Sequence, residues 1–309
     1  RNLPAPRSRS AFTLAERDLI PEGITCDPAT GTFFVGSMYR RKIVAIDRDG
    51  EVRDLVAPAA DDLYSPLGMR FDARRGTLWV ASAALPTMQG FDAASHGGRS
   101  ALHEIDVTTG RTRNRYPRDD LRPHLLNDLV LGPRGEVYVS DSATGELLVL
   151  EPGPEAMFEA LIPPGELHYP NGVALSDDAQ TVFVADFVRG LTAVRVADRE
   201  RTTLGHPRGV STHGLDGLYF HRGALIGVDN GAGAGRIVRL DLAPTHDRIL
   251  RAEVLEAGHP AFEIPTTGTV MGDDLYYIAN SQLRSFEGGK IFPLDRLRPV
   301  QILRLPLTR

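Results

Sequence analysis

The sequence predicts an all-β protein, a six-bladed β-propeller with four antiparallel strands in each blade. One motif recurs six times along the 309 residues: a short apolar strand with glycine or aspartate near its start, a turn, and a second apolar strand. The motif starts near residues 22, 67, 127, 171, 216 and 267, which are 45, 60, 44, 45 and 51 residues apart. A period of about 40 to 50 residues is typical of propeller blades.

The first blade illustrates the elements expected in every repeat. Glu22–Asp27 leads through a turn into Thr32–Gly36, and Ile43–Asp47 follows as a third apolar strand. Each repeat buries its apolar face against the next, so a chain of this length need not divide into separate cores. We therefore expect residues 1–309 to form a single propeller domain.

The ends of the chain and two long loops complete the predicted architecture. The last repeat ends with Gln301–Leu305 as its third strand, and Ala11–Ala15 is expected to supply the fourth and close the ring, which removes exposed sheet edges. Residues 1–10 are expected to be a tail. Two inserts, 83–100 and 281–299, are expected to act as lids or specificity elements at the end where the inner strands begin.

Composition excludes several classes of function. The 35 Lys and Arg against 40 Asp and Glu give a net charge of −5 without a basic stripe, which argues against nucleic-acid binding. No apolar run approaches the length of roughly 20 residues that spans a bilayer. Cys26, the single cysteine, excludes an internal disulfide or a thiolate metal cluster. The start Arg1–Pro4, without methionine, weakly favours a periplasmic or secreted protein and leaves a cytoplasmic one open. A monomer or a simple homo-oligomer fits equally well.

One position of the repeat carries the predicted chemistry. The first strand of each blade lines the channel of a propeller, so equivalent residues face one another across it. Around the ring this position is Glu22, Leu67, Asn127, Asn171, Asp216 and Thr267. Carboxylates and amide carbonyls are ligands of hard cations, and residues from separate blades suit the long, irregular bonds of calcium. We predict that Glu22, Asn127, Asn171 and Asp216 bind a divalent cation, with Ca²⁺ as the expected ion.

An alternative interpretation is that Asn-Gly and Asp-Gly are ordinary turn dipeptides. The shared register favours ligands, because turn residues need not fall at the same phase of successive repeats. Leu67 and Thr267 offer no strong ligand, which leaves a sector open for water and substrate, with Thr267 as a substrate contact. Three aspartates at the ends of second strands either tune the charge of the site or stabilise turns: Asp141, Asp186 and Asp229.

Histidines form a second register, three residues before the ring position. His124, His168 and His213 precede the ring residues of three consecutive blades, and histidine carries protons near neutral pH. We predict that His213 or His168 assists Asp216 in catalysis, and that His124, together with His96 of the first insert, contacts substrate. Alternatively, the histidines orient the ligands or bind carbonyl groups of the loops.

Four motifs resemble the gluconolactonase/regucalcin (senescence marker protein) superfamily, which includes diisopropylfluorophosphatase and the paraoxonases. They are Pro21–Gly23, Leu126–Asp128, Pro170–Ser176 and Leu215–Leu218, and the resemblance extends over nearly the whole chain. It implies a central calcium or similar ion held by a Glu, two Asn residues and an Asp. At the matching positions of this sequence these are Glu22, Asn127, Asn171 and Asp216.

The sequence departs from this family at two points. The arginine that sugar-lactone members place two residues before the blade-three asparagine is Leu125 here, which weakens the case for a sugar substrate. The second, structural calcium of the paraoxonases is not predicted, because Gly23 has no side chain to offer, although Asp128 could serve. Strictosidine-synthase-like propellers share the fold but lack the ligand quartet.

The predicted function is a calcium-dependent hydrolase that opens a small lactone or ester. The ion would polarise the carbonyl, and Asp216, or less favourably Glu22, with His213 or His168 would activate water. A separate base is needed because calcium lowers the pKa of bound water less than zinc does. The alternatives are a phosphotriesterase and a non-catalytic propeller that the metal stabilises.

Overall fold

The computed structural model describes residues 6–118, 120–153, 155–231, 233 and 235–308. They form two compact units: unit 1 contains residues 6–7 and 127–262, and unit 2 contains residues 8–126 and 263–308. Each unit contains three four-stranded antiparallel sheets, the blades of a six-bladed β-propeller, which confirms the predicted fold class. Residues 1–5 of the expected tail lie outside the described residues.

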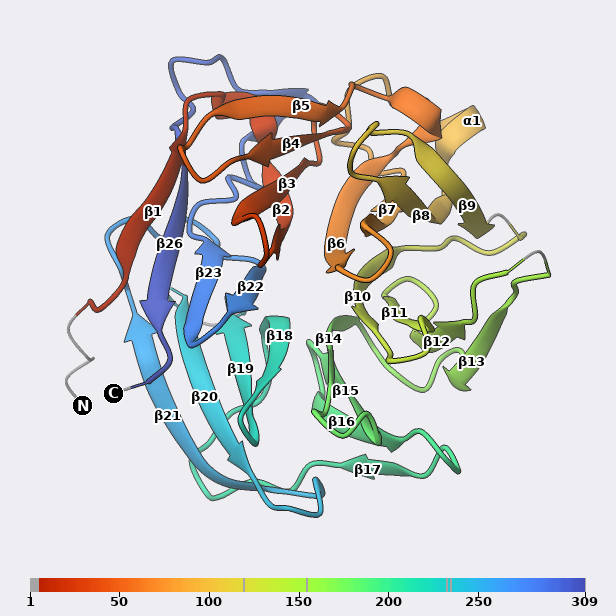
Figure 1. The fold of residues 1–309 in the computed structure, drawn as a ribbon, viewed down its shortest axis with the longest axis vertical. Helices are drawn as coiled ribbons and strands as arrows, with labels where there is room; N and C mark the ends of the chain where they lie inside the picture. Colours follow the sequence, from red (N-terminus) through yellow and green to blue (C-terminus); the bar gives the residue numbers. More distant parts are fainter. Residues whose placement is uncertain (1–5, 119, 154, 232, 234, 309) are drawn as a thin grey trace. The chain divides into compact units, whose positions relative to one another are not determined.

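In unit 1 each blade follows the chain, because four consecutive strands pair in sequence order (Figure 1). Successive strands are joined by short loops, as antiparallel pairing allows. The inner strands begin within one residue of the predicted repeat starts. The strands are β10 (Leu126–Leu131), β11 (Val137–Asp141), β12 (Glu146–Leu150), β13 (Phe158–Ile162), β14 (Pro170–Leu175), β15 (Thr181–Asp186), β16 (Gly190–Arg195), β17 (Arg201–Thr203), β18 (Leu215–His221), β19 (Ala224–Asp229), β20 (Arg236–Leu242) and β21 (Ile249–Ala257).

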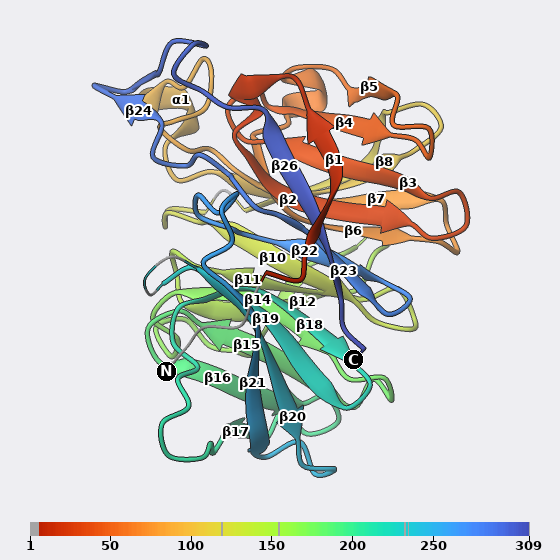
Figure 2. The same cartoon turned by 90° about the vertical axis from the view of Figure 1, so that its left-hand side faces the viewer.

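In unit 2 two blades also follow the chain, and the third combines its two ends. The strands of the first two blades are β2 (Pro21–Asp27), β3 (Thr32–Ser37), β4 (Lys42–Ile46), β5 (Val52–Val56), β6 (Ser65–Asp72), β7 (Thr77–Ala83), β8 (Ser100–Asp106) and β9 (Thr112–Arg118). The third blade has the order β1–β26–β23–β22. Its strands are β1 (Arg9–Leu14), β22 (Gly268–Met271), β23 (Asp274–Ile278) and β26 (Val300–Pro306). The predicted N-terminal fourth strand is thus confirmed: β1 lies beside β26, antiparallel (Figure 2).

Apolar side chains between successive blades form the core. The stacked rings of Phe183 and Phe220, with centroids 5.9 Å apart, join the blades that begin with β14 and β18. In unit 2, Phe33 packs between Phe12 and Tyr276, so the N-terminal strand is also held by aromatic contacts. Every blade therefore buries its apolar face against a neighbour, as the repeat pattern predicts.

The two inserts contain the remaining regular structure. The first carries the one-turn helix α1 (Ala93–His96), and the second carries a hairpin of β24 (Phe286–Glu287) and β25 (Lys290–Ile291). Two 3₁₀ turns, Arg17–Leu19 and Ala60–Asp62, precede inner strands. Among the described residues, none of the helices has the length and apolar character needed to cross a membrane.

His103 is a fully buried titratable group in β8. Its Nε2 lies 3.1 Å from Ser82 Oγ, and that hydroxyl donates to the carbonyl of Ala101, so Nε2 must carry the ring proton. Burial, assisted by the charge of Arg115, lowers the pKa of His103 from 6.5 to about 3. The neutral imidazole is therefore the form that the folded protein accepts.

This burial predicts acid sensitivity. Because the pKa of His103 is lower in the folded than in the unfolded state, the unfolded chain binds an extra proton between about pH 6.5 and pH 3. The free energy of unfolding should fall as pH decreases, by up to about 1.4 kcal/mol per pH unit from this residue. Urea unfolding of His103→Gln at pH 4, 5, 6 and 7 should show a slope shallower by about that amount. The matched control is His206→Gln at an exposed site, and identical slopes for wild type and His103→Gln would contradict the prediction.

Candidate metal centre and catalytic site

Four ring positions lie at β-bulges of inner strands. In β2, β6, β14 and β18 the pairing with the next strand shifts register across the ring residue and the glycine that follows it. A bulge redirects a side chain and is frequent beside functional sites. The bulged pairs are Glu22–Gly23, Leu67–Gly68, Asn171–Gly172 and Asp216–Gly217. The turn interpretation is wrong for these dipeptides, because they lie inside strands.

The glycines at two bulges allow neighbouring inner strands to approach closely. A Cβ atom on Gly172 would lie 2.3 Å from the carbonyl oxygen of Asp216, and one on Gly23 would lie 1.8 Å from that of Leu67. No side chain fits at such distances. The glycine after the ring residue is therefore required by packing, and within unit 1 it keeps Asn171 and Asp216 on closely spaced strands.

Unit 1 contains three of the four predicted metal ligands. Asn127, Asn171 and Asp216 come from the inner strands of three consecutive blades, and each is about 6% exposed. Hydrogen bonds connect the first two blades: Asn127 Nδ2 donates to Ser142 Oγ (2.9 Å), which in turn donates to the carbonyl of Pro170 (2.5 Å). The side-chain nitrogen of Asn127 is thereby held by a hydrogen bond within the protein, and the side-chain oxygen is the atom that could bind a metal ion.

The other two predicted ligands also offer one oxygen each. Asn230 Nδ2 donates to Oδ2 of Asp216, and the amide of Asn171 also hydrogen-bonds to the Asp216 carboxylate. Asn171 Oδ1 and Asp216 Oδ1 are buried atoms with no hydrogen-bond partner among the described residues. An unsatisfied buried polar atom costs about 1–3 kcal/mol, so both oxygens gain if a cation binds them.

Burial dominates the electrostatics of Asp216. Desolvation raises its pKa from 3.8 to about 7, and the nearby charge of Asp128 acts in the same direction. The hydrogen bonds from Asn230 and Asn171 lower the pKa without cancelling these effects. A carboxylate in this state lacks a positive partner, as expected for a ligand of a metal ion.

Asp128, beside the ring position, is a structural residue. Its Oδ1 accepts the N–H of Leu129 (2.8 Å), and its Oδ2 accepts the N–H of Val173 in the next inner strand (3.2 Å). Both oxygens thus accept backbone N–H groups, and the bond to Oδ2 joins β10 to β14. These hydrogen bonds give Asp128 a role in holding neighbouring inner strands together.

Ser142 and Asn230 were not identified from the sequence. Each directly follows the aspartate that ends a second strand, and each orients the ring residue of its own blade. The backbone N–H groups of Asn230 and Gly231 both donate to the carbonyl of Gly214, which fixes the loop beside β18. The only signal in the sequence is this position after the strand-ending aspartate.

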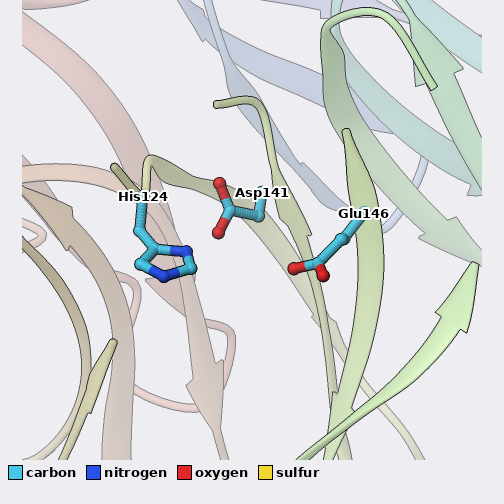
Figure 3. Close-up of side chains that lie close together, drawn as sticks. All are labelled: His124, Asp141 and Glu146. Carbon is cyan, nitrogen blue, oxygen red and sulfur yellow. The ribbon is translucent and has the colours of Figure 1, made fainter. Parts of the chain in front are cut away.

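The three strand-ending aspartates stabilise turns, as one of the two sequence interpretations proposed. The N–H groups two and three residues further on donate to Asp141 and Asp186, and Gly231 N–H donates to Asp229. Asp141 lies directly opposite Glu146 on the neighbouring strand, and both are buried (Figure 3). Two buried carboxylates repel each other, so this pair is a second place in unit 1 where a cation would be stabilised.

The three register histidines differ in their surroundings. His124, in unit 2, is buried, and its Nε2 lies 2.9 Å from Asp120 Oδ1. His168 and His213, in unit 1, are exposed. His213 Nδ1 lies 2.6 Å from the carbonyl oxygen of Val188. Because a carbonyl only accepts, Nδ1 carries the proton and the lone pair of the neutral ring is on Nε2.

The remaining predicted residues belong to unit 2. Glu22 is buried at the bulge of β2, and the hydroxyl of Thr267 donates to its backbone carbonyl. His96 ends α1, where its Nδ1 accepts the N–H of Asp92 (2.9 Å) and its ring packs at 6.1 Å from those of Tyr64 and Phe91. Thr267 and His96 are thus engaged in local structure, and their contact with substrate stays a prediction.

The residues of unit 1 fit a hard divalent cation. They offer two amide oxygens and one carboxylate oxygen, without a thiolate, and two of these atoms are buried without a hydrogen-bond partner in the described parts of the chain. Oxygen ligands of this kind suit calcium or magnesium. The arrangement can hold a positive charge at the buried oxygens of Asn171 and Asp216.

Comparison with known proteins identifies structural neighbours. No family model matches the sequence, and neither does any curated protein. Among solved structures, a gluconolactonase from Xanthomonas campestris matches with a TM-score of 0.64 and 16% identity over 99% of both chains. Regucalcin from Agrobacterium tumefaciens, described as a calcium-binding protein, has the same TM-score and identity over 98% of this chain and 95% of its own. The expected resemblance to gluconolactonase and regucalcin is thus found in the structure.

The same fold also carries other activities. Virginiamycin B lyase from Staphylococcus aureus matches with a TM-score of 0.63 and 14% identity, over 97% of this chain and 99% of its own. A likeness at this level of identity establishes the fold, while the chemistry has to be argued from the residues of the site.

In metal-free buffer, replacing Asp216 or Asp128 with asparagine should change the free energy of unfolding in opposite directions. Because folding raises the pKa of Asp216, the folded protein binds the extra proton, and stability should fall as pH rises from about 4 to 7. Asp216→Asn removes this penalty and should raise the free energy of unfolding at pH 8 in EDTA. Asp128→Asn removes the same charge but replaces an oxygen that accepts an N–H, and should lower it by about 1–3 kcal/mol. Urea unfolding at pH 8 measures both. A loss of stability in Asp216→Asn equal to that in Asp128→Asn would contradict this account.

Proposed function

We propose that the protein is a calcium-dependent hydrolase that opens a lactone or a small ester. The main observation behind this proposal is the set of side-chain oxygens on the inner strands of unit 1. Two of them, Asn171 Oδ1 and Asp216 Oδ1, are buried without a hydrogen-bond partner among the described residues. Neighbours that are themselves a gluconolactonase and a calcium-binding regucalcin support the same class of activity. We assign Asn127, Asn171 and Asp216 as ligands, and Glu22 of unit 2 stays a ligand predicted from the sequence. The calcium ion would polarise the substrate carbonyl and stabilise the negative charge that develops on its oxygen.

The protein's own residues supply orientation and proton transfer. Ser142 and Asn230 hold Asn127 and Asp216 so that each ligand offers an oxygen. We propose His213 as the base, because its bond to the Val188 carbonyl leaves the lone pair on Nε2. His168 is less favoured, because its ring has no such orienting bond among those described, although its backbone N–H is held by Asp186 (2.7 Å).

The proposed reaction conserves atoms and charge. Water loses a proton to Nε2 of His213 while its oxygen forms a bond to the acyl carbon. The bond between that carbon and the ring or alkoxy oxygen then breaks, and the departing oxygen takes the proton from Nε2. The products are a carboxylic acid, which ionises in solution, and an alcohol, which remain one molecule when the substrate is a lactone.

Turnover should depend on calcium. After EDTA treatment, hydrolysis of an aliphatic lactone, a sugar lactone, an aryl ester and a phosphotriester is measured with and without added Ca²⁺. We expect carboxylic ester or lactone hydrolysis that Ca²⁺ restores, because the buried oxygens need the ion. Preference for the phosphotriester would assign the site to phosphoryl chemistry. A rise in melting temperature with Ca²⁺ but no turnover would mean that the ion is structural and would overturn the proposal.

His213→Gln should separate proton transfer from metal binding. Loss of a general base lowers kcat by about 100-fold to 10,000-fold. The rise in melting temperature on adding Ca²⁺ should be unchanged, because His213 is not assigned as a ligand. The matched variant His168→Gln should lower kcat much less. A larger loss of kcat in His168→Gln than in His213→Gln would reverse the assignment of the base.

A further inference from the structure

Two buried polar atoms on neighbouring strands of unit 2 have no hydrogen-bond partner among the described residues. They are Nδ1 of His103 in β8 and Nε of Arg115 in β9. His103 is fully buried, and the Nε atom of Arg115 is hidden from solvent although the residue as a whole is half-buried. Buried polar groups in proteins are nearly always hydrogen-bonded, either to the protein or to ordered water. These two atoms therefore indicate a partner from outside the described residues.

The two atoms are complementary in their hydrogen-bonding chemistry. Nε2 of His103 carries the ring proton, because Ser82 Oγ, 3.1 Å away, donates its own proton to the carbonyl of Ala101. Nδ1 of the neutral ring is then an acceptor only, and Nε of the Arg115 guanidinium is a donor only. A molecule between them must accept one hydrogen bond and donate another, which a water molecule can do.

The strand pairing brings the two side chains together. His103 and Arg115 lie directly opposite each other in the β8–β9 register, at the outer edge of the blade (Figure 1). Directly paired residues point to the same face, with Cβ atoms about 4.5–5.5 Å apart. Their proximity is also electrostatic, because the charge of Arg115 adds to the effect of burial in lowering the pKa of His103. The two unpartnered atoms thus belong to adjacent side chains on one face of the sheet.

The guanidinium group of Arg115 is held in place on its other side. Its Nη2 donates to the hydroxyl of Tyr64 (3.2 Å), and its central carbon lies 5.5 Å from the centroid of the Tyr64 ring. The Tyr64 ring also meets the ring of His96 in α1, with centroids 6.1 Å apart. Arg115 is therefore anchored between the edge strand and the first insert.

We propose that one buried water molecule bridges Arg115 and His103, accepting the Nε–H of Arg115 and donating to Nδ1 of His103. The water satisfies both buried groups and joins the edge strand β9 to β8. Through Arg115 and Tyr64 it also connects the interior of the blade with the first insert. Buried waters of this kind are part of a protein's structure and are unfavourable to remove. The site lies within unit 2 and does not depend on the metal centre proposed for unit 1.

A crystal structure of the wild-type protein, at a resolution that places ordered waters, tests the site directly. It should show one water within about 2.7–3.2 Å of both Arg115 Nε and His103 Nδ1. A direct hydrogen bond between these two atoms, or no density between them, would overturn the proposal.

A double-mutant cycle measures the coupling that the water provides. His103→Leu removes the acceptor, and Arg115→Lys keeps the positive charge but removes Nε. Urea unfolding at pH 8, where His103 is neutral in both states, gives the unfolding equilibrium constant of each variant. The double variant should raise this constant by less than the product of the single effects, by at least about twofold, as for groups in one network.

Arg113→Lys is the matched control, because Arg113 is an exposed arginine of the same strand that bonds Asp106. Its effect and that of His103→Leu should multiply without coupling, since they share no partner. If the effects of His103→Leu and Arg115→Lys also multiply, the two side chains do not share a water and the proposal is wrong.

Discussion

The burial of the Asp216 carboxylate is the constraint that determines how the starts of the inner strands of unit 1 are arranged. A buried charge is unfavourable unless a counter-charge or hydrogen bonds compensate for it. Asp216 receives donors from Asn230 and Asn171, yet its pKa remains raised because the desolvation outweighs them. The protein leaves Oδ1 of Asp216 and Oδ1 of Asn171 unsatisfied instead of adding donors. Under the proposed function, a bound cation would supply this compensation.

This constraint gives a reason for the glycines of the inner strands. Ligands from different blades can share an ion only if their backbones come close together, and a Cβ on Gly172 would collide with the carbonyl of Asp216. The bulge at the same point redirects the ring residue out of the regular pleat. The Asn171–Gly172 and Glu22–Gly23 pairs therefore combine a proposed ligand with a glycine that lets the next inner strand approach closely.

The sequence allows the fold and the ring register to be predicted because both repeat. Each blade buries its apolar strands in the same way, so six weak local patterns reinforce one another, and the N-terminal strand follows from the missing partner of β26. Ser142 and Asn230 occupy equivalent positions but are different residue types, so no repeated pattern reveals them. Their roles also depend on the conformation of loops, which the sequence does not specify. The same holds for the histidines: equal spacing placed His124, His168 and His213 in one register, yet one is buried and two are exposed.

In unit 1 the proposed metal ligands lie in strands, whereas side chains in the loops are free to set specificity. The proposed ligands lie in inner strands whose close packing tolerates little change. Phe187 and Val188 lie in a loop that Asp186 holds through main-chain amides. Because Asp186 binds the backbone of that loop, side chains there can vary without loss of the turn, and the carbonyl that orients His213 is kept. A propeller built in this way can acquire new substrates by changing loop side chains while the oxygen cluster stays intact. A fold whose loops can change in this way is compatible with different reactions on different members.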